Sequence, residues 1–506
     1  MPRHASLWIE TAPAPARPPL SGDARADVCV VGGGIVGLTA AYHLALAGRS
    51  VVLLERNQVV SGVSGKTTAK VTLQHGLYYD GLVKRYGRKR ALVHVEANTA
   101  GAQAIESLQA ALGADASYTK APSYVYTEDP KQVRQLEAEA AACKDLGLPA
   151  SFTTETELPF AVAGAVRFEG QAHFHPRKYL LALARAAERL GVVIHEGTHV
   201  TGLDDGEPCK VSTDAGDVRA KHVVVATNVP INERSFYVMR MQVKREYAAA
   251  GRSTGRRLEG MYVNCDEPRR SVRPYAGDPG MLVFSGESHH VAKHQETEPH
   301  YDALAAFSTR FGVQDLEFQW STQDYYPIDE VPMVGRYGPT TRHTFTATGF
   351  RAWGMTMGTA AGLMLTDLVV KGSSPWSDLY DPFTAARLLK PLGRPDTYHL
   401  VGTAVEGLVG RRLKPYGAGE LQPGEGRVMD AGIHKVAVCR DRQGQLHSVM
   451  AKCSHMGCIV SWNTAEQSWD CPCHGSRFSP AGEVLRGPAT KPLEPAKEPE
   501  AVSRRE

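Results

Sequence analysis

The sequence contains no long apolar run, no strong excess of charge and no secretory leader pattern. It has 506 residues, of which 42% are hydrophobic and 22% charged, and its net charge is +3. This balance gives no electrostatic basis for nucleic-acid binding. The most apolar stretch, residues 28–47, is interrupted by four glycines and two polar aromatic residues, which disfavours a membrane span. Residues 1–25 form a Pro/Ala-rich arm without the basic-then-apolar order of a signal peptide, so we expect a cytoplasmic protein.

Cysteine is sparse and unevenly placed. Five of the nine cysteines are widely separated, a pattern that predicts buried free thiols in a reducing compartment. The remaining four lie in two short segments, CSHMGC at residues 453–458 and CPCHGS at residues 471–476. Each segment therefore combines cysteines with one histidine.

The two segments hold a C-x-H pair and a C-x-x-H pair, with fifteen residues between His455 and Cys471. This pattern suits a two-iron cluster with different ligands on its irons. Thiolates of Cys453 and Cys471 can bind the iron that stays ferric, and neutral imidazoles of His455 and His474 the iron that accepts the electron. A zinc site is the alternative, but its ligand pairs are usually C-x2-4-C or H-x3-5-H.

The motif resembles the Rieske 2Fe-2S family, in particular the disulfide-bearing branch of cytochrome bc-type complexes. The resemblance implies the four ligands above, a Cys458–Cys473 disulfide that clamps the two loops, and a hydrogen bond from Ser476 to a cluster sulfide. That branch often has a tyrosine two positions further, where this chain has Phe478. We therefore expect a potential in the lower part of the Rieske range of roughly −150 to +300 mV.

A dinucleotide-binding fingerprint lies near the N-terminus. An apolar strand over residues 27–31 runs into a G-x-G-x-x-G turn, a helix over 38–47 and a second strand over 50–55 that ends in an acid. The glycines permit a tight turn, close approach to a pyrophosphate and close helix–strand packing, and the helix N-terminus supplies N–H groups. The predicted cofactor residues of this unit are Gly32, Gly33, Gly34, Ile35, Val36, Gly37 and Glu55, the last as acceptor for ribose hydroxyls.

Four further blocks resemble the D-amino-acid-oxidase-like flavoproteins: residues 61–70, 191–200, 223–228 and 347–362. The resemblance implies FAD, with backbone N–H groups and the last helix N-terminus facing the flavin pyrimidine. It covers roughly residues 26–378 and implies a substrate domain built from inserts at about 75–165 and 240–325. The implied FAD contacts are Ser61, Ser64, Thr67, Thr68, Val200, Ala226, Thr227, Gly349, Trp353, Gly354 and Met355.

The expected organisation is therefore an arm (1–25), an FAD-dependent oxidoreductase domain (26–378), a connector (379–412), a Rieske domain (413–495) and a disordered tail (496–506). The fold class is an α/β Rossmann-like FAD domain with an α+β substrate domain, plus a small all-β iron–sulfur domain. Helical runs are expected over 91–112 and 130–146, and a strand over 280–286.

No catalytic acid or base can be assigned from the sequence. His173, His175, His289 and His290 are candidates for a base, although surface or core roles are more common. Arg245 and Arg273 could bind a substrate carboxylate, although structural arginines are more common.

The combination predicts an FAD-dependent dehydrogenase of a small substrate, in which electrons leave one at a time through the cluster to an external acceptor. The amine or amino-acid substrate is implied by the flavoprotein resemblance. Two alternatives stay open: a reductase that runs the same chain in reverse, and an electron-transfer module of a larger assembly. NAD(P)H is disfavoured because a second fingerprint is lacking. A Rieske oxygenase is disfavoured because no histidine follows His474 to hold a mononuclear iron.

Overall fold

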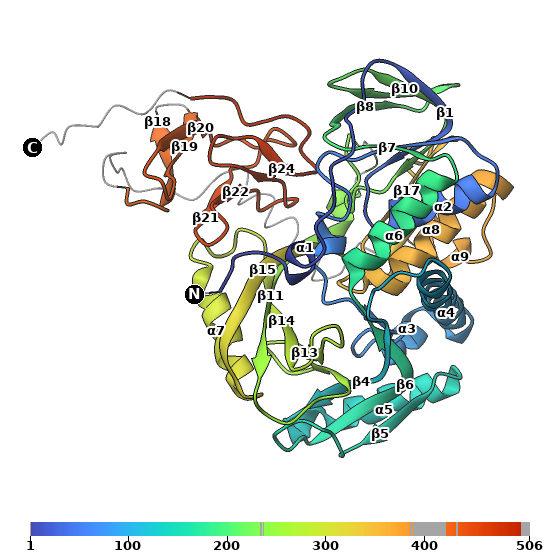
Figure 1. The fold of residues 1–506 in the computed structure, drawn as a ribbon, viewed down its shortest axis with the longest axis vertical. Coiled ribbons are helices and arrows are strands. Elements are labelled where there is room, and N and C mark those ends of the chain that lie inside the picture. The colour runs from blue at the N-terminus through green and yellow to red at the C-terminus, as the bar shows by residue number, and fades with distance from the viewer. Residues whose placement is uncertain are drawn as a thin grey trace, which may run out of the picture.

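The computed structural model describes residues 2–232, 235, 237–384, 387, 421–431 and 434–496. Two large sheets and their helices form the body of the molecule, and a smaller group of strands from the C-terminal region lies at one side of it (Figure 1). Most of the expected connector, the first residues of the expected Rieske domain and nearly all of the expected tail lie outside the described residues.

The first sheet carries the dinucleotide fingerprint. Its parallel strands follow the order β7-β2-β1-β10-β17, and β16 and the β8–β9 pair add antiparallel strands at its edges. The central strands are buried because α2, α6 and α8 cover the sheet, as is usual for parallel strands. The predicted strand, turn, helix and strand are confirmed. The bounds are β1 Ala24–Val31, α2 Ile35–Leu46, β2 Val51–Leu54, α6 Pro176–Arg189, β7 Val193–His195, β8 Val200–Asp204, β9 Cys209–Thr213, β10 Asp217–Val225, β16 Met333–Arg336, β17 Thr344–Thr348 and α8 Gly354–Lys371.

The second sheet is built mainly from the two expected inserts. Its order is β15-β11-β14-β13-β12-β4-β6-β3, with β5 paired to β6, and the long β11 pairs antiparallel with both β14 and β15. Both predicted helical runs are confirmed as α4 and α5, and the predicted strand lies within β14. The bounds are β3 Lys70–Val71, α3 Tyr79–Tyr86, α4 Arg88–Ala111, β4 Thr119–Thr127, α5 Val133–Asp145, β5 Ala150–Thr153, β6 Gly164–His173, β11 Met241–Ser253, β12 Met261–Asn264, β13 Arg270–Pro274, β14 Met281–His290, α7 Glu298–Thr309 and β15 Val313–Pro327.

The C-terminal unit contains a three-stranded and a four-stranded antiparallel sheet, as expected for a small all-β domain. A core of buried cysteines, tryptophans and aliphatic residues lies between the strands. The bounds are β18 Gly426–Ala431, β19 His434–Arg440, β20 Leu446–Met450, β21 Ser461–Asn463, β22 Ser468–Asp470, β23 Arg477–Phe478 and β24 Val484–Arg486.

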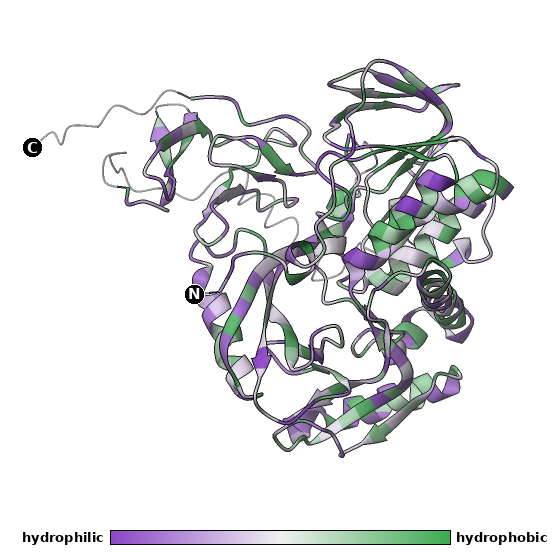
Figure 2. Cartoon of the chain, viewed as in Figure 1, coloured by the Kyte–Doolittle hydropathy of each residue, from purple (hydrophilic) through white to green (hydrophobic). Residues whose placement is uncertain are grey.

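The N-terminal arm is not a loose appendage. It forms the short helix α1 (Leu7–Glu10), whose Leu7 and Trp8 are buried against the second sheet. The Trp8 indole N–H donates to the Thr67 carbonyl at 2.6 Å. The helices that cover the first sheet carry both apolar and polar segments (Figure 2), and within the described ranges none is long and apolar enough to cross a membrane.

Candidate active site and iron–sulfur centre

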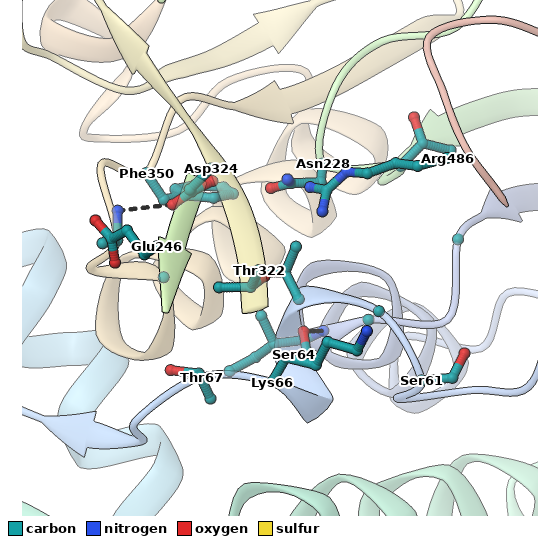
Figure 3. Close-up of a pocket in the computed structure, with 18 of the residues that line it drawn as sticks. Ser61, Ser64, Lys66, Thr67, Asn228, Glu246, Thr322, Asp324, Phe350 and Arg486 are labelled. Carbon is teal, nitrogen blue, oxygen red and sulfur yellow. Dashed lines mark hydrogen bonds between the residues drawn. The ribbon is translucent and has the colours of Figure 1, made fainter. Parts of the chain in front are cut away.

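A cavity of about 590 Å³ lies where the two large sheets meet. Its walls come from the fingerprint turn, the loop after β2, strands β11 and β15, the turn before α8, and a C-terminal segment around β24. Figure 3 draws Glu246 and Asp324 on the same side of the cavity as Phe350, and Thr322 nearer to Ser64. Residues from every predicted FAD block line this cavity.

The glycine turn fits its predicted geometry. Gly32 has φ of 111°, and a Cβ there would lie 2.5 Å from the Ala226 carbonyl oxygen. A Cβ at Gly37 would lie 1.9 Å from the Gly32 carbonyl oxygen, so only glycine allows α2 to pack this closely on β1. A Cβ at Gly34 would approach only Ser64 Oγ, at 3.2 Å, and this position borders the cavity. The turn therefore leaves room for a ligand at Gly34.

Two predicted contacts have protein partners of their own. The Glu55 carboxylate accepts from the Gly33 N–H at 2.8 Å and from the Asn57 N–H at 2.9 Å. Burial raises the Glu55 pKa, and the two N–H donors oppose that shift. Ser64 Oγ accepts from the Ile35 N–H at 3.0 Å, so Ser64 already satisfies one donor at the α2 N-terminus while its own O–H stays available.

Sixteen of the predicted FAD residues line the cavity, and two do not. Gly37 acts through packing, and Gly349 has φ of 82° with Pro327 only 2.5 Å from where its Cβ would be, so it shapes the closing turn. The lining residues are Gly32, Gly33, Gly34, Ile35, Val36, Glu55, Ser61, Ser64, Thr67, Thr68, Val200, Ala226, Thr227, Trp353, Gly354 and Met355.

The cavity also holds charged residues that the sequence did not single out. Asp324 accepts from the Ala352 N–H at 2.6 Å, and burial raises its pKa to about 6. Lys70 donates to Thr68 and Ser271 hydroxyls at 3.1 Å, and burial lowers its pKa to about 7. Arg486, which comes from the C-terminal unit, points toward Asn228 in Figure 3. Nothing in the sequence linked Arg486 to this cavity.

The candidate cluster ligands converge in the C-terminal unit. Cys453 and Cys471 are buried and unbridged, and a hydrogen bond from the Cys471 thiol lowers the pKa of Cys453. The rings of His455 and His474 lie 5.1 Å apart at 89°. Among the described residues, no hydrogen-bond partner reaches Nδ1 of either histidine. Burial lowers the pKa values to about 4 and about 3 respectively, so both imidazoles are neutral, as metal ligands must be.

The surroundings of these ligands match the resemblance. The predicted disulfide is confirmed, since Cys458 and Cys473 are bonded. Ser476 is buried. Its hydroxyl forms a hydrogen bond with the Cys453 thiol and accepts a hydrogen bond from the Ala489 N–H at 3.0 Å. Phe478 is fully buried and offers no hydroxyl. Two orphaned imidazole nitrogens beside two thiols form the donor set that a 2Fe-2S cluster of this type requires.

The C-terminal unit is docked on β11 and β15 through polar contacts. Arg245 and Asp470, both buried, form an ion pair at 2.5 Å. Gln323 Nε2 donates to the Gly475 carbonyl at 2.5 Å, and the Tyr325 hydroxyl donates to the His474 carbonyl at 3.1 Å. The hypothesis that Arg245 binds a substrate carboxylate is therefore wrong, because its guanidinium is committed to this interface.

The other arginine and histidine candidates also have structural partners. Arg273 donates to the Thr68 carbonyl at 2.5 Å and lies 3.2 Å from His173 Nδ1, so it too is committed. His175 caps α6 by accepting from the Lys178 N–H at 3.2 Å. None of His173, His175, His289 and His290 is among the residues described as lining the cavity. The structure does not bring these histidines to the place where a base would act.

Comparison with known proteins places the chain in a family. The FAD dependent oxidoreductase family, DAO, matches residues 27–368, and the Rieske 2Fe-2S domain family matches residues 414–497. The chain belongs to the FAD dependent oxidoreductase family and carries a C-terminal Rieske domain. It is an FAD- and 2Fe-2S-dependent oxidoreductase, and the cavity and the Cys/His centre described above fit these two cofactors.

Individual relatives resemble the FAD-binding part, the Rieske part or the whole chain. YhfW of Bacillus subtilis (strain 168), whose name assigns it provisionally to the Rieske 2Fe-2S iron–sulfur proteins, is 33% identical over 96% of each chain. The iron–sulfur subunit 1 of the cytochrome b6-f complex from Nostoc sp. is 51% identical over 47 residues, 9% of this chain and 26% of that protein. Glycine oxidase from Geobacillus kaustophilus superposes with a TM-score of 0.59 at 20% identity, over 72% of this chain and 98% of that one, and so shares the fold.

Proposed function

We propose that this protein oxidises the C–N bond of a small amine or amino acid and sends the electrons singly through its cluster to an external one-electron acceptor. In this reaction the substrate loses a hydride and a proton and becomes an imine. FAD, when bound, supplies a two-electron acceptor for the hydride, and the cluster supplies a one-electron exit. The two electrons from each substrate then reduce two equivalents of the acceptor.

The observation that carries the proposal is a chain of contacts along β15 between the two centres. The Tyr325 hydroxyl donates to the carbonyl of the cluster ligand His474 at 3.1 Å. The Tyr325 N–H donates to Asp324 at 2.9 Å, and Asp324 accepts from the Ala352 N–H at 2.6 Å. Ala352 lies in the turn before α8, which we propose to lie beside the flavin. One buried strand thus connects the two cofactor sites within a single chain.

The fingerprint residues are proposed to hold FAD. Gly34 and the N-terminal turn of α2 face the pyrophosphate, because this end offers free N–H groups and lacks a Cβ in the way. The remaining lone pairs of Glu55 accept from the ribose. The N-terminus of α8, at Gly354, faces the flavin pyrimidine, where its partial positive charge stabilises negative charge on reduced flavin.

Although cationic side chains outnumber acidic ones in the cavity lining, one local pair of carboxylates supports an amine as the group that reacts. Glu246 and Asp324 both line the cavity, and two carboxylates at one end attract an ammonium group. The raised pKa of Asp324, about 6, suits a group that takes up a proton near neutral pH. Among relatives, gamma-glutamylputrescine oxidoreductase of Escherichia coli (strain K12) is 24% identical over 72% of this chain and 89% of that protein, and its name also refers to an amine.

The test is anaerobic. Purified holoprotein is mixed with a panel of amines and amino acids, and flavin absorbance is followed together with the EPR signal of the reduced cluster. Flavin bleaching followed by the cluster signal is expected for at least one substrate. If no compound bleaches the flavin although dithionite reduces both centres, the proposal fails, and the reductase or the electron-transfer module takes its place.

A further inference from the structure

Three histidines meet below the docked Rieske domain. His289 is the next-to-last residue of β14, His294 lies in the following loop and His300 lies in the first turn of α7, which packs beside β15 (Figure 1). One ring nitrogen of each lies within 4.8 Å of the others. His289 is buried, His300 half-buried and His294 exposed. This group of three histidines is therefore buried at His289 and open to solvent at His294.

The tautomer of His289 is set by its backbone. Its Nδ1 lies 2.8 Å from the His290 carbonyl oxygen, which can only accept, so Nδ1 carries the proton. The lone pair is then on Nε2, where the Tyr247 hydroxyl reaches it at 3.0 Å. An imidazole whose other nitrogen donates to a carbonyl is the usual form of a metal-ligating histidine. A metal ion at this position takes the place of the Tyr247 hydroxyl on Nε2.

The other two rings complete the arrangement. His300 stacks on His289, with ring centroids 4.5 Å apart and planes at 19°, and His294 closes the group at 5.1 Å from His289 and 5.4 Å from His300. The Glu287 carboxylate lies 3.8 Å from His300 Nδ1 and is itself paired with Arg270 at 2.7 Å. A carboxylate behind a histidine is the second recurrent support of a metal ligand.

We propose that His289, His294 and His300 bind one divalent transition-metal ion, with zinc as the best-matched ion. Imidazole nitrogens suit zinc, copper and nickel, and three histidines leave a fourth position for water. Zinc–nitrogen bonds of about 2.0–2.1 Å bring the ligand nitrogens to about 3.4 Å from one another. Closure to this distance requires the stacked rings of His289 and His300 to turn toward a common point and the exposed His294 to rotate.

The bound ion would hold in place the segment between β14 and α7, which contacts the Rieske domain. The Gln295 carbonyl accepts from the Thr464 N–H at 3.1 Å, and the Thr297 hydroxyl donates to the Asn463 side-chain oxygen at 2.7 Å. The Tyr301 hydroxyl donates to Glu466 at 2.8 Å. These contacts hold the turn between β21 and β22, so an ion that ties His294 to His289 and His300 also steadies the docked domain.

The test uses untagged holoprotein whose Rieske cluster has been verified by EPR and by two irons per chain. Titration with zinc chloride, followed by calorimetry and by metal analysis after gel filtration, is expected to give one zinc per chain beyond the two irons. His294→Ala removes an exposed ligand without disturbing the core, and it should weaken zinc binding by more than about 100-fold. His343→Ala, a partly exposed histidine beside the first sheet, serves as the matched control and should bind zinc as the natural protein does.

Cobalt binding gives a second readout, since a tetrahedral site with three imidazoles produces a visible absorption band that His294→Ala and His300→Ala should abolish. Absence of a tight zinc equivalent in the natural protein would overturn the proposal. Equal zinc affinity in the natural protein and in His294→Ala would also overturn it, because the metal would then be bound elsewhere on the surface.

Discussion

Removal of the Arg245 guanidinium should loosen the Rieske domain from the flavin domain. Arg245 and Asp470 are both buried, and loss of one partner from such a pair costs about 3–5 kcal/mol. Asp470 keeps hydrogen bonds from Asn463 at 3.0 Å, Ser468 at 2.9 Å and Arg477 at 3.1 Å, so the lower end of this range applies. About 3 kcal/mol corresponds to a roughly 100-fold fall in the ratio of docked to undocked domains.

The assay is the rate of cluster reduction after anaerobic reduction of the flavin in Arg245→Met, measured by stopped flow beside limited proteolysis. Slower cluster reduction and faster cleavage between the domains are expected, with FAD content unchanged. Arg252→Met is the matched control, because Arg252 lies on the same strand but pairs with Asp278 at an exposed site worth no more than about 1 kcal/mol. An Arg245→Met protein with natural proteolysis and natural cluster reduction would refute the reasoning.

The remaining predictions concern the two cofactor sites. His474→Ala should abolish the Rieske EPR signal and leave FAD absorbance intact, because its orphaned Nδ1 is a proposed ligand; a retained signal would contradict the assignment. Gly34→Val should reduce FAD content at least tenfold with little loss of secondary structure, because the new side chain would enter the cavity; unchanged FAD content would contradict the fingerprint. Phe478→Tyr should raise the cluster potential in a redox titration, since it adds a donor beside the ligand sulfur, and an unchanged or lower potential would contradict that reading. Below about pH 6, kcat/KM should fall as Asp324 takes up a proton, and this acid limb should disappear in Asp324→Asn.

Local sequence patterns predicted much of the fold. The strand, glycine turn, helix and strand at the N-terminus follow from short-range periodicity and from turn chemistry, and the structure contains them as β1, α2 and β2. The Cys458–Cys473 bridge and the convergence of His455 with His474 also followed from one compact motif. Such features depend on residues that are close in sequence or on a motif with fixed spacing.

Long-range contacts could not be predicted, because the spacing of residues along the sequence carries no information about them. Arg245 and Asp470 are 225 positions apart, and only the folded chain shows that the arginine belongs to an interface instead of a substrate site. Arg486 reaches the flavin cavity from the opposite end of the chain. The histidine cluster was equally hidden, since the sequence suggested His289 together with His290 as candidates for a base, while His294 and His300 meet His289 only through the path of the β14–α7 loop.

The central claim is that electrons pass from flavin to cluster within one chain. The most direct measurement is the rate of cluster reduction after anaerobic photoreduction of the bound flavin, followed by rapid-freeze EPR at several protein concentrations. The account predicts first-order formation of the Rieske signal at a rate that does not depend on protein concentration. A fully reduced flavin beside an oxidised cluster, or a rate that rises in proportion to concentration, would contradict it.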